Sequence, residues 1–302
     1  MRERGFGTAL VMARVAYLTG RSFAGAPFAS GEVHPLEQPG CALVIASGAK
    51  RGLQIEVRYW DEELAGFDAA IIRSCWDYHL RADEFVATLE AHERAGVRVF
   101  NPPDVVRWNA RKTYLQDLGD AAIPTVWAER ADARTVAQAF DALDASEIVV
   151  KPQVGAGSVE TVRLRRNAWS EADLIAGPRG PAMIQPFLRA IETEGERSLF
   201  WFGGVFSHAV RKVPMGGDWR ANIPGQTRFV AEAPPAAAIE AAEAARARAP
   251  RDLLYVRIDL VLGDDGAWRV IEIEAIEPYL FLDFAPAGAG VFVGAIARVL
   301  GV

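Results

Sequence analysis

The chain has 302 residues, of which 51% are hydrophobic and 24% are charged, and its formal net charge is −6. This length allows two domains or one large α/β unit, and the composition is ordinary for a globular enzyme. The acidic balance excludes a general nucleic-acid binder, because such proteins carry an excess of basic residues. No apolar run approaches the roughly 18 residues of a membrane span. Cys41 and Cys75 form no CxxC motif, so we expect a cytoplasmic protein without a disulfide framework. From the charge and the apolar runs we expect neither a nucleic-acid partner nor a membrane partner.

The first third of the chain alternates between strand and helix patterns. If Met12 is the natural start, residues 1–11 are a disordered extension. Strands are predicted at residues 14–19, 54–59, 68–73 and 97–100, and helices at 42–52 and 81–95. Strands that alternate with helices indicate a parallel sheet with crossover connections. We therefore predict a parallel α/β domain over residues 1–103.

A dense group of polar and aromatic residues follows the strand at 68–73. Ligands gather at the carboxyl ends of strands in parallel sheets, and this segment, RSCWDYH, begins at such an end. Its candidates for substrate contact are Arg73, Ser74, Trp76, Tyr78 and His79. The alternative is a surface loop with a tryptophan packed beneath it.

The segment Asn101-Pro102-Pro103-Asp104 marks a boundary, where Asp104 is able to cap a helix. A second helix is predicted over residues 110–118, with Asn109 as its N-cap and Gly119 as its stop. Lys112 falls in the first turn of this helix, where a cation opposes the helix dipole unless an anion is nearby.

A strand at residues 147–151 delivers Lys151 to a glycine-rich loop, and a second strand follows at 159–165. The loop consists of Gly155, Ala156, Gly157 and Ser158. Glycines here allow backbone amides to approach a phosphate closely. The dinucleotide fingerprint fails, because Glu160 takes the place of the third glycine and a strand follows instead of a helix. The pattern fits a flap over a nucleoside triphosphate, and a plain hairpin with a glycine turn is the alternative.

Two further segments carry polar groups between apolar residues. The segment 182–188 contains one amide, Gln185, and is suited to line an adenine pocket, with a core strand as the alternative. A hairpin of strands at 199–202 and 205–212 ends on Arg211 and Lys212. An arginine near the polar loop that follows, residues 215–222, could clamp a phosphoryl group.

The stretch from Tyr255 to Tyr279 predicts an acidic hairpin around the turn at residues 263–266. If Leu262 pairs with Ala267, then Asp259 faces Val270 and Arg257 faces Glu272. Side chains alternate between the faces of a strand, which gives an acidic face of Asp259, Glu272 and Glu274 and a buried face of Ile258, Leu260, Ile271 and Ile273.

In this register Asp259 and Glu272 are diagonal neighbours, about 7–8 Å apart at the backbone. An all-oxygen site of this kind suits Mg²⁺, which prefers few protein ligands together with phosphates and water. A solvated hairpin face with ordinary acids is the alternative.

In this order the motifs resemble the ATP-grasp superfamily, closest to the glutathione-synthetase-like carboxylate–amine ligases, over roughly residues 100–300. The segment from Arg73 to Tyr78 and the segment from Asn101 to Leu115 are also similar to a smaller group that includes the cyclo-ligase of cycloserine biosynthesis. The resemblance implies an N-terminal parallel α/β domain followed by an α+β ATP-grasp module. Its small subdomain would span residues 104–190 and carry the flap, and its C-terminal subdomain would span 191–302 and carry the Mg²⁺ site.

Roles for individual residues follow from the same resemblance. Lys112 and Lys151 would hold the ATP phosphates, beneath the flap of Gly155, Ala156, Gly157 and Ser158. Adenine would contact Gln185, Phe187 and Leu188, and the ribose would contact Glu196 or Glu192. Asp259 and Glu272 would bind Mg²⁺, with Glu274 standing where the family commonly has asparagine. Arg211 would stabilise the γ-phosphoryl group, and Arg220 and Asn222 would hold the carboxylate substrate.

The resemblance implies a ligase that uses ATP and Mg²⁺. A substrate carboxylate attacks the γ-phosphorus of ATP to give an acyl phosphate and ADP, and an amine then displaces phosphate. One alternative is an intramolecular cyclo-ligase of the cycloserine type, and another is a non-catalytic ATP-binding regulatory module. Expected partners are small carboxylate and amine substrates, and many relatives form homo-oligomers.

Overall fold

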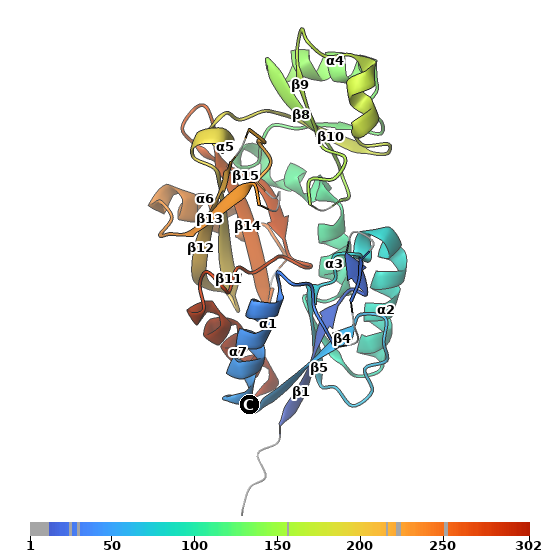
Figure 1. The fold of residues 1–302 in the computed structure, drawn as a ribbon, viewed down its shortest axis with the longest axis vertical. Coiled ribbons are helices and arrows are strands. Elements are labelled where there is room, and N and C mark those ends of the chain that lie inside the picture. Colours follow the sequence, from blue (N-terminus) through green and yellow to red (C-terminus); the bar gives the residue numbers. More distant parts are fainter. Residues whose placement is uncertain are drawn as a thin grey trace, which may run out of the picture.

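The computed structural model describes residues 12–23, 26–28, 31–155, 157–215, 217–221, 225–250 and 253–302. The expected extension at 1–11 and the predicted site residues Ala156 and Asn222 lie outside these ranges. Three larger sheets follow one another along the length of the molecule (Figure 1). The mixed α/β fold with an N-terminal parallel sheet is confirmed, and the domain boundaries at residues 103 and 190 stay a prediction.

The N-terminal sheet has the strand order β4-β1-β5-β6, and every neighbouring pair is parallel. Its elements are β1 (Ala13–Thr19), α1 (Gln38–Ala49), β4 (Leu53–Tyr59), β5 (Ala69–Ser74), α2 (Ala82–Arg94) and β6 (Arg98–Phe100). Two short strands, β2 (Ser22–Phe23) and β3 (Ala26–Pro27), pair beside it. The first helix begins four residues before the predicted start, because Pro39 occupies its first turn, where a missing N–H costs nothing.

The linking segment differs from its prediction. Asp104 caps no helix, since α3 (Pro103–Ala110) begins after Pro102 and Asp104 lies in its first turn. Asn109 is inside this helix and is not a cap. Its side chain reaches the final strand instead, donating to Ile273 O at 2.7 Å and accepting from Ala275 N at 2.8 Å. Residues 112–121 then form a 3₁₀ segment that is interrupted at Gly119.

The small antiparallel sheet has the strand order β7-β10-β8-β9. Its strands are β7 (Val126–Ala128), β8 (Glu147–Pro152), β9 (Val162–Arg165) and β10 (Ala182–Pro186), and α4 (Ala133–Ala142) covers one side. Strand β8 ends next to the glycine loop, so Lys151 stands at the entrance of the predicted flap.

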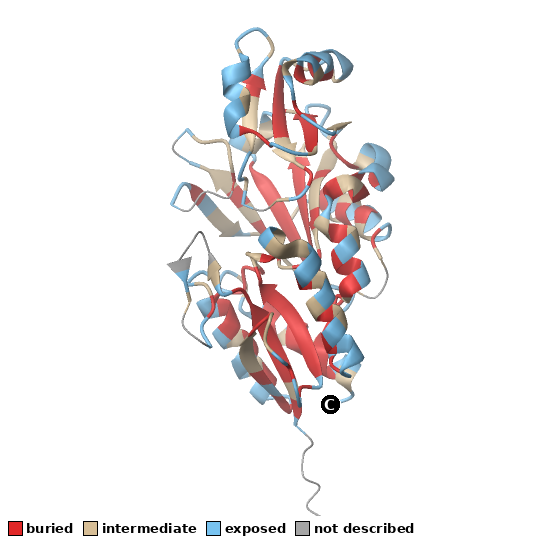
Figure 2. Ribbon diagram, turned by 90° about the vertical axis from the view of Figure 1, so that its right-hand side faces the viewer, coloured by how far each residue is buried: buried red, intermediate tan, exposed pale blue. Residues whose placement is uncertain are grey.

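The central sheet is antiparallel, with the strand order β13-β12-β11-β14-β15. Its strands are β11 (Glu196–Phe202), β12 (Val205–Pro214), β13 (Thr227–Ala231), β14 (Tyr255–Leu262) and β15 (Trp268–Glu274). The short α5 (Ala190–Thr193) precedes it, α6 (Ala236–Arg246) covers one face, and α7 (Ala287–Leu300) lies beside α1 (Figure 1). Figure 2 shows that the strands of the central and N-terminal sheets are mostly buried, whereas the helices keep exposed outer sides.

The predicted register of the acidic hairpin is wrong. Asp259 pairs directly with Glu272 and Arg257 with Glu274, while Leu260 pairs with Val270. The turn is one residue longer than expected, because the Gly263 N–H donates to Ala267 O. A bulge then leaves one residue of β15 without a partner on β14, so the pairing beyond it is shifted by two residues from the predicted register.

The bulge also changes which side chains enter the core. Val270 is fully buried, whereas Ile271, which was predicted to be buried, is only half-buried. Asp259 and Glu272 are therefore directly opposite each other rather than diagonal neighbours. Among the described residues, no helix combines the length and apolar character that crossing a membrane requires.

Candidate active site

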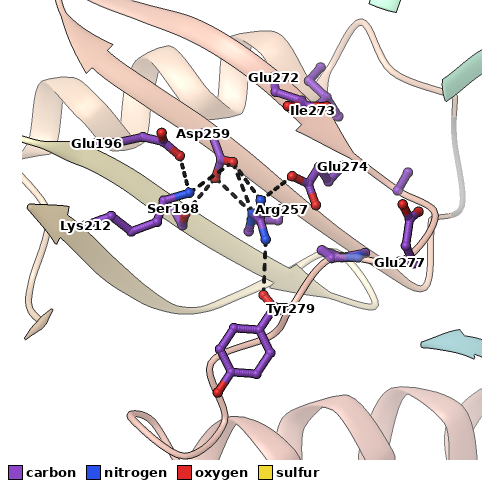
Figure 3. A network of polar contacts seen from close by, with 12 residues as sticks. Glu196, Ser198, Lys212, Arg257, Asp259, Glu272, Ile273, Glu274, Glu277 and Tyr279 are labelled. Carbon is purple, nitrogen blue, oxygen red and sulfur yellow. Dashed lines mark hydrogen bonds and ion pairs between the residues drawn. The ribbon is translucent and has the colours of Figure 1, made fainter. Parts of the chain in front are cut away.

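One face of the central sheet gathers acidic and basic side chains from four neighbouring strands (Figure 3). They are Glu196 and Ser198 on β11, Lys212 on β12, Arg257 and Asp259 on β14, and Glu272 and Glu274 on β15. Alternation along each strand places these residues on one side and the apolar residues of the core on the other.

Asp259 is the most heavily bonded carboxylate of this face and is 3% exposed. Ser198 Oγ donates to it at 2.6 Å, Arg257 Nη2 at 2.8 Å, and Lys212 Nζ lies 3.4 Å away. Burial opposes ionisation, but Arg257 and Lys212 outweigh burial and hold the pKa of Asp259 well below its ordinary value. Asp259 is therefore expected to be ionised at neutral pH.

Lys212 is fully buried and bridges Glu196 and Asp259. Burial raises the pKa of Glu196 to about 7 although Lys212 lowers it in part. Arg211, to which the resemblance assigned the γ-phosphoryl group, points to the opposite face, where its Nε lies 3.1 Å from Glu232. This corrects the sequence-based assignment, since adjacent residues of a strand face opposite sides and Lys212 is the one that faces the carboxylates.

The two predicted phosphate lysines lie between the small sheet and the acidic face. Lys112 Nζ donates to Gly155 O at 2.8 Å and lies 2.9 Å from Glu272 Oε1, so it links the base of the flap to β15. Within the described part of the chain, no hydrogen bond or ion pair holds the amine of Lys151. Burial lowers the pKa of Lys151 to about 8. A phosphate would supply the anionic partner that this amine lacks among the described residues.

The predicted adenine segment continues from β10. Gln185 is buried and donates from Nε2 to Thr125 Oγ1 at 2.9 Å. Phe187 donates its N–H to Glu147 O, and its ring lies beneath the guanidinium of Arg163. Leu188 comes next and leads towards α5.

Two glutamates were predicted as alternatives for the ribose, and they have different surroundings. Glu192 is exposed on α5 and accepts from Arg163 at 2.6 Å. Glu196 faces the carboxylate cluster. In the glycine loop, Gly157 and Ser158 both adopt a left-handed backbone conformation. The role of each residue stays a prediction.

Arg73 and Trp76, predicted to contact substrate, hold a segment of backbone in place. Arg73 is 1% exposed, donates to Pro278 O, and lies 3.8 Å from Glu37. Trp76 Nε1 donates to Glu277 O at 3.0 Å. Both residues therefore position the segment that follows β15, because their polar atoms contact its backbone carbonyl groups.

The other predicted substrate residues are dispersed. Ser74 is buried, with its Oγ 2.9 Å from Thr19 Oγ1. Tyr78 is 6% exposed, and its hydroxyl has no hydrogen-bond partner among the described residues. His79 has a buried Nδ1 without a hydrogen-bond partner. Arg220 is bound to Asp218 at 2.7 Å in the short segment 217–221. The structure thus brings Tyr78, but not Ser74, into the neighbourhood of the acidic face.

The acidic face fits Mg²⁺ through two residues rather than three. Among the described residues, no group of three or more His, Cys, Asp or Glu side chains is arranged to hold a metal ion. Arg257 contacts both Glu274 and Asp259. Mg²⁺ in phosphate sites requires only one or two carboxylates and keeps water and phosphate ligands, so the opposed pair Asp259 and Glu272 fits its chemistry.

Four residues at this site were not among the predicted site residues: Ser198, Lys212, Arg257 and Glu277. Strand alternation identifies Lys212 and Arg257. Lys212 lies one position from Arg211 and therefore on the opposite face from it, whereas Arg257 lies two positions from Asp259 and therefore on the same face. Glu277 lies beyond the end of β15, where alternation carries no information, and only the contacts made by its neighbours place it here.

Comparison with known proteins agrees with this arrangement. Residues 112–279 match the model of the prokaryotic glutathione synthetase ATP-grasp domain, and residues 15–101 match that of the N-terminal domain of D-cycloserine synthetase DcsG. The cycloserine biosynthesis protein DcsG of Streptomyces lavendulae is 34% identical over 270 residues, covering 82% of this chain and 90% of that protein.

A glutathione synthetase of Ralstonia nicotianae is 28% identical over 255 residues, covering 79% of this chain and 74% of that protein. The crystal structure of D-cycloserine synthetase DcsG superposes with a TM-score of 0.78 at 29% identity and covers 95% of this chain and 100% of that one. The chain therefore belongs to the family of the prokaryotic glutathione synthetase ATP-grasp domain and is an ATP- and Mg²⁺-dependent, ADP-forming carbon–nitrogen ligase.

Proposed function

We propose that the protein activates a small amino-acid-like carboxylate as an acyl phosphate and joins it to a nitrogen nucleophile. The observation that carries the proposal is the direct pairing of Asp259 with Glu272, with Lys112 linking Glu272 to the flap at Gly155. In this proposal the carboxylates serve as metal ligands and Lys112 as a phosphate ligand, on the two sides of one site. Such an arrangement suits phosphoryl transfer, where positioning and charge neutralisation supply most of the catalysis.

Each charged residue has a distinct task in this proposal. Lys112 and Lys151 bind the ATP phosphates, and Asp259 and Glu272 hold Mg²⁺, which supplies neutralisation of phosphate charge when bound. A substrate carboxylate oxygen attacks the γ-phosphorus, and ADP leaves. The nitrogen then attacks the acyl carbon, phosphate leaves, and the nitrogen gives up a proton. Arg257, held by Asp259 and Glu274, is placed to stabilise negative charge that develops on the acyl oxygen.

A second candidate is intramolecular ring closure, in which the carboxylate and the nitrogen belong to one molecule. The match of residues 15–101 with the N-terminal domain of D-cycloserine synthetase favours this form. In the proposed reaction one substrate suffices, and its product is lighter than the substrate by one water.

The test measures ADP release from Mg-ATP with a panel of amino acids and of ureido- and aminooxy-substituted analogues. Parallel wells contain hydroxylamine, which traps an acyl phosphate as a hydroxamate. Release that depends on one carboxylate, with matching hydroxamate, supports the proposal, and mass spectrometry separates cyclisation from joining of two molecules. Lys151→Met serves as the inactive control. Carboxylate-dependent ADP release without hydroxamate would contradict the acyl phosphate.

A further inference from the structure

Each carboxylate of the acidic face lies beside at least one basic side chain, with one exception. Glu196 is paired with Lys212, Asp259 with Arg257 and Lys212, Glu272 with Lys112, and Glu274 with Arg257. Glu277 is the remaining carboxylate. Among the described residues, no basic side chain lies within 4.0 Å of it, although it is half-buried beside this cluster.

The surroundings of Glu277 disfavour an isolated negative charge. Burial is the main cause that raises its pKa well above the ordinary value, Glu274 raises it further, and Lys112 offsets only part of the effect. An unpaired, partly buried carboxylate is costly unless a ligand compensates it. A cation bound beside Glu277 would lower this pKa again and hold the carboxylate in its charged form.

The backbone of this segment is held firmly by side chains from the N-terminal part of the chain and from the central sheet. Trp76 Nε1 donates to the carbonyl of Glu277, Arg73 donates to that of Pro278, and the Tyr255 hydroxyl lies 2.8 Å from Ile276 O. Three side chains thus fix three consecutive carbonyl groups. Such preorganisation is typical of a side chain that must meet a ligand in a defined geometry.

A second unpartnered polar group lies nearby. Tyr78 is 6% exposed, and its hydroxyl has no hydrogen-bond partner among the described residues. Besides burial, the carboxylates that raise its pKa are Glu277, Glu272 and Glu274, in that order, so the Tyr78 side chain lies in the neighbourhood of these carboxylates. A ligand with N–H groups would supply this hydroxyl with a hydrogen bond.

We propose that Glu277, together with the hydroxyl of Tyr78, binds the protonated amino group of the substrate and so selects carboxylates that also carry an amine. This assignment rests on the proposed function, and it names the residues that recognise the substrate class. A protonated amine supplies a positive charge to Glu277 and three donors for the two unpartnered groups. In Figure 3 Glu277 lies on the far side of Glu274 from Asp259, away from the pair that fits Mg²⁺.

The test compares the wild type with Glu277→Gln and with a control, Glu240→Gln, whose side chain is exposed on α6. Binding is measured by calorimetry with Mg²⁺ and a non-hydrolysable ATP analogue present. The probes are pairs of carboxylates that differ only in the amino group: alanine and propionate, and ureido-substituted serine and its deamino counterpart.

We expect the wild type and Glu240→Gln to bind the amine-bearing member of at least one pair about 10- to 100-fold more tightly than its counterpart, as for a charged hydrogen bond. Glu277→Gln should lose this preference and keep its affinity for the nucleotide. Tyr78→Phe removes only the hydroxyl and should reduce the preference by about 3- to 10-fold.

The outcomes separate this inference from the proposed function. An undiminished preference in Glu277→Gln, or no binding of any amine-bearing probe to the wild type, would overturn the inference. Weaker Mg²⁺ binding in Glu277→Gln would make Glu277 a metal ligand and overturn it as well. Amine-selective binding without ADP release would instead count against the proposed function, while the assignment of Glu277 would stand.

Discussion

Glu196 and Lys212 lie directly opposite each other on β11 and β12, and the amine of Lys212 reaches Asp259 as well. Lys212 has no exposed surface. A single buried cation therefore compensates two carboxylates from different strands of the central sheet. The adjacent Arg211 points the other way and approaches Glu232, so one position along the strand separates a site residue from a residue of the opposite face.

Replacement of Lys212 by methionine should destabilise the protein and abolish activity. It removes the cation between two buried carboxylates, and breaking such a pair costs about 3–5 kcal/mol of the free energy of unfolding. Arg211→Met should cost less than about 1 kcal/mol, because its partner Glu232 and Arg211 itself are partly exposed. Urea unfolding and ADP release measure both effects. Equal losses in the two variants would contradict the assignment of Lys212.

Asp259→Asn should reduce Mg²⁺-dependent ADP release by about 10²- to 10³-fold, the scale seen when one group that stabilises charge is removed. The amide keeps the shape of the carboxylate but not the charge that attracts Mg²⁺. The fold should persist, as judged by circular dichroism, since Arg257 keeps its contact with Glu274. Wild-type turnover in this variant would remove Asp259 from the metal site.

ATP binding should be accompanied by proton uptake near pH 8. Burial lowers the pKa of Lys151 to about 8 in the free protein, and a phosphate next to the amine would raise it again. Calorimetry at about pH 8.5 in buffers of different ionisation enthalpy measures the proton uptake. Lys151→Met should abolish this uptake, and an unchanged uptake in that variant would assign it to another group.

The same shift predicts the direction of a change in stability. The pKa of Lys151 is lower in the folded state than its ordinary value of 10.5. The contribution of Lys151 to the free energy of unfolding is therefore fully present above pH 10.5. The contribution is lost as the pH falls through about 8. Lys151→Met should therefore raise the melting temperature at pH 7, and a lower melting temperature would show that the lysine is not destabilising.

Asn101 should be essential for the stability of the contact between the end of β6 and the hairpin of β14 and β15. Its buried side chain donates to Tyr255 O and Ala275 O and accepts from Leu254 N. Its φ of 56° lies in the left-handed region. Asn101→Gly should lose about 3 kcal/mol of the free energy of unfolding, at about 1 kcal/mol for each hydrogen bond. Asn101→Ala should lose about 1 kcal/mol more through backbone strain. Equal values for the two variants would exclude the strain.

Periodicity in the sequence was sufficient to predict the parallel N-terminal sheet, the strand that ends on Lys151 and the acidic hairpin. In each case burial of one face imposes a pattern on the residues themselves. The order of the motifs along the chain indicated a resemblance to ATP-grasp enzymes, and the comparisons confirm this family. The error at Arg211 shows the limit of position-by-position transfer, since a displacement of one residue along a strand changes the face.

The sequence by itself determined which residues form strands and that an acidic face exists, because hydrophobic alternation is a local property. Only the tertiary structure decided the register of Asp259 with Glu272, since the bulge depends on how Val270 packs and on how Lys112 and Arg257 pair. It also decided that Arg73 and Trp76 hold the segment of Glu277. Those contacts join residues about 200 positions apart, and no local pattern encodes a contact between groups that only the packed core brings together.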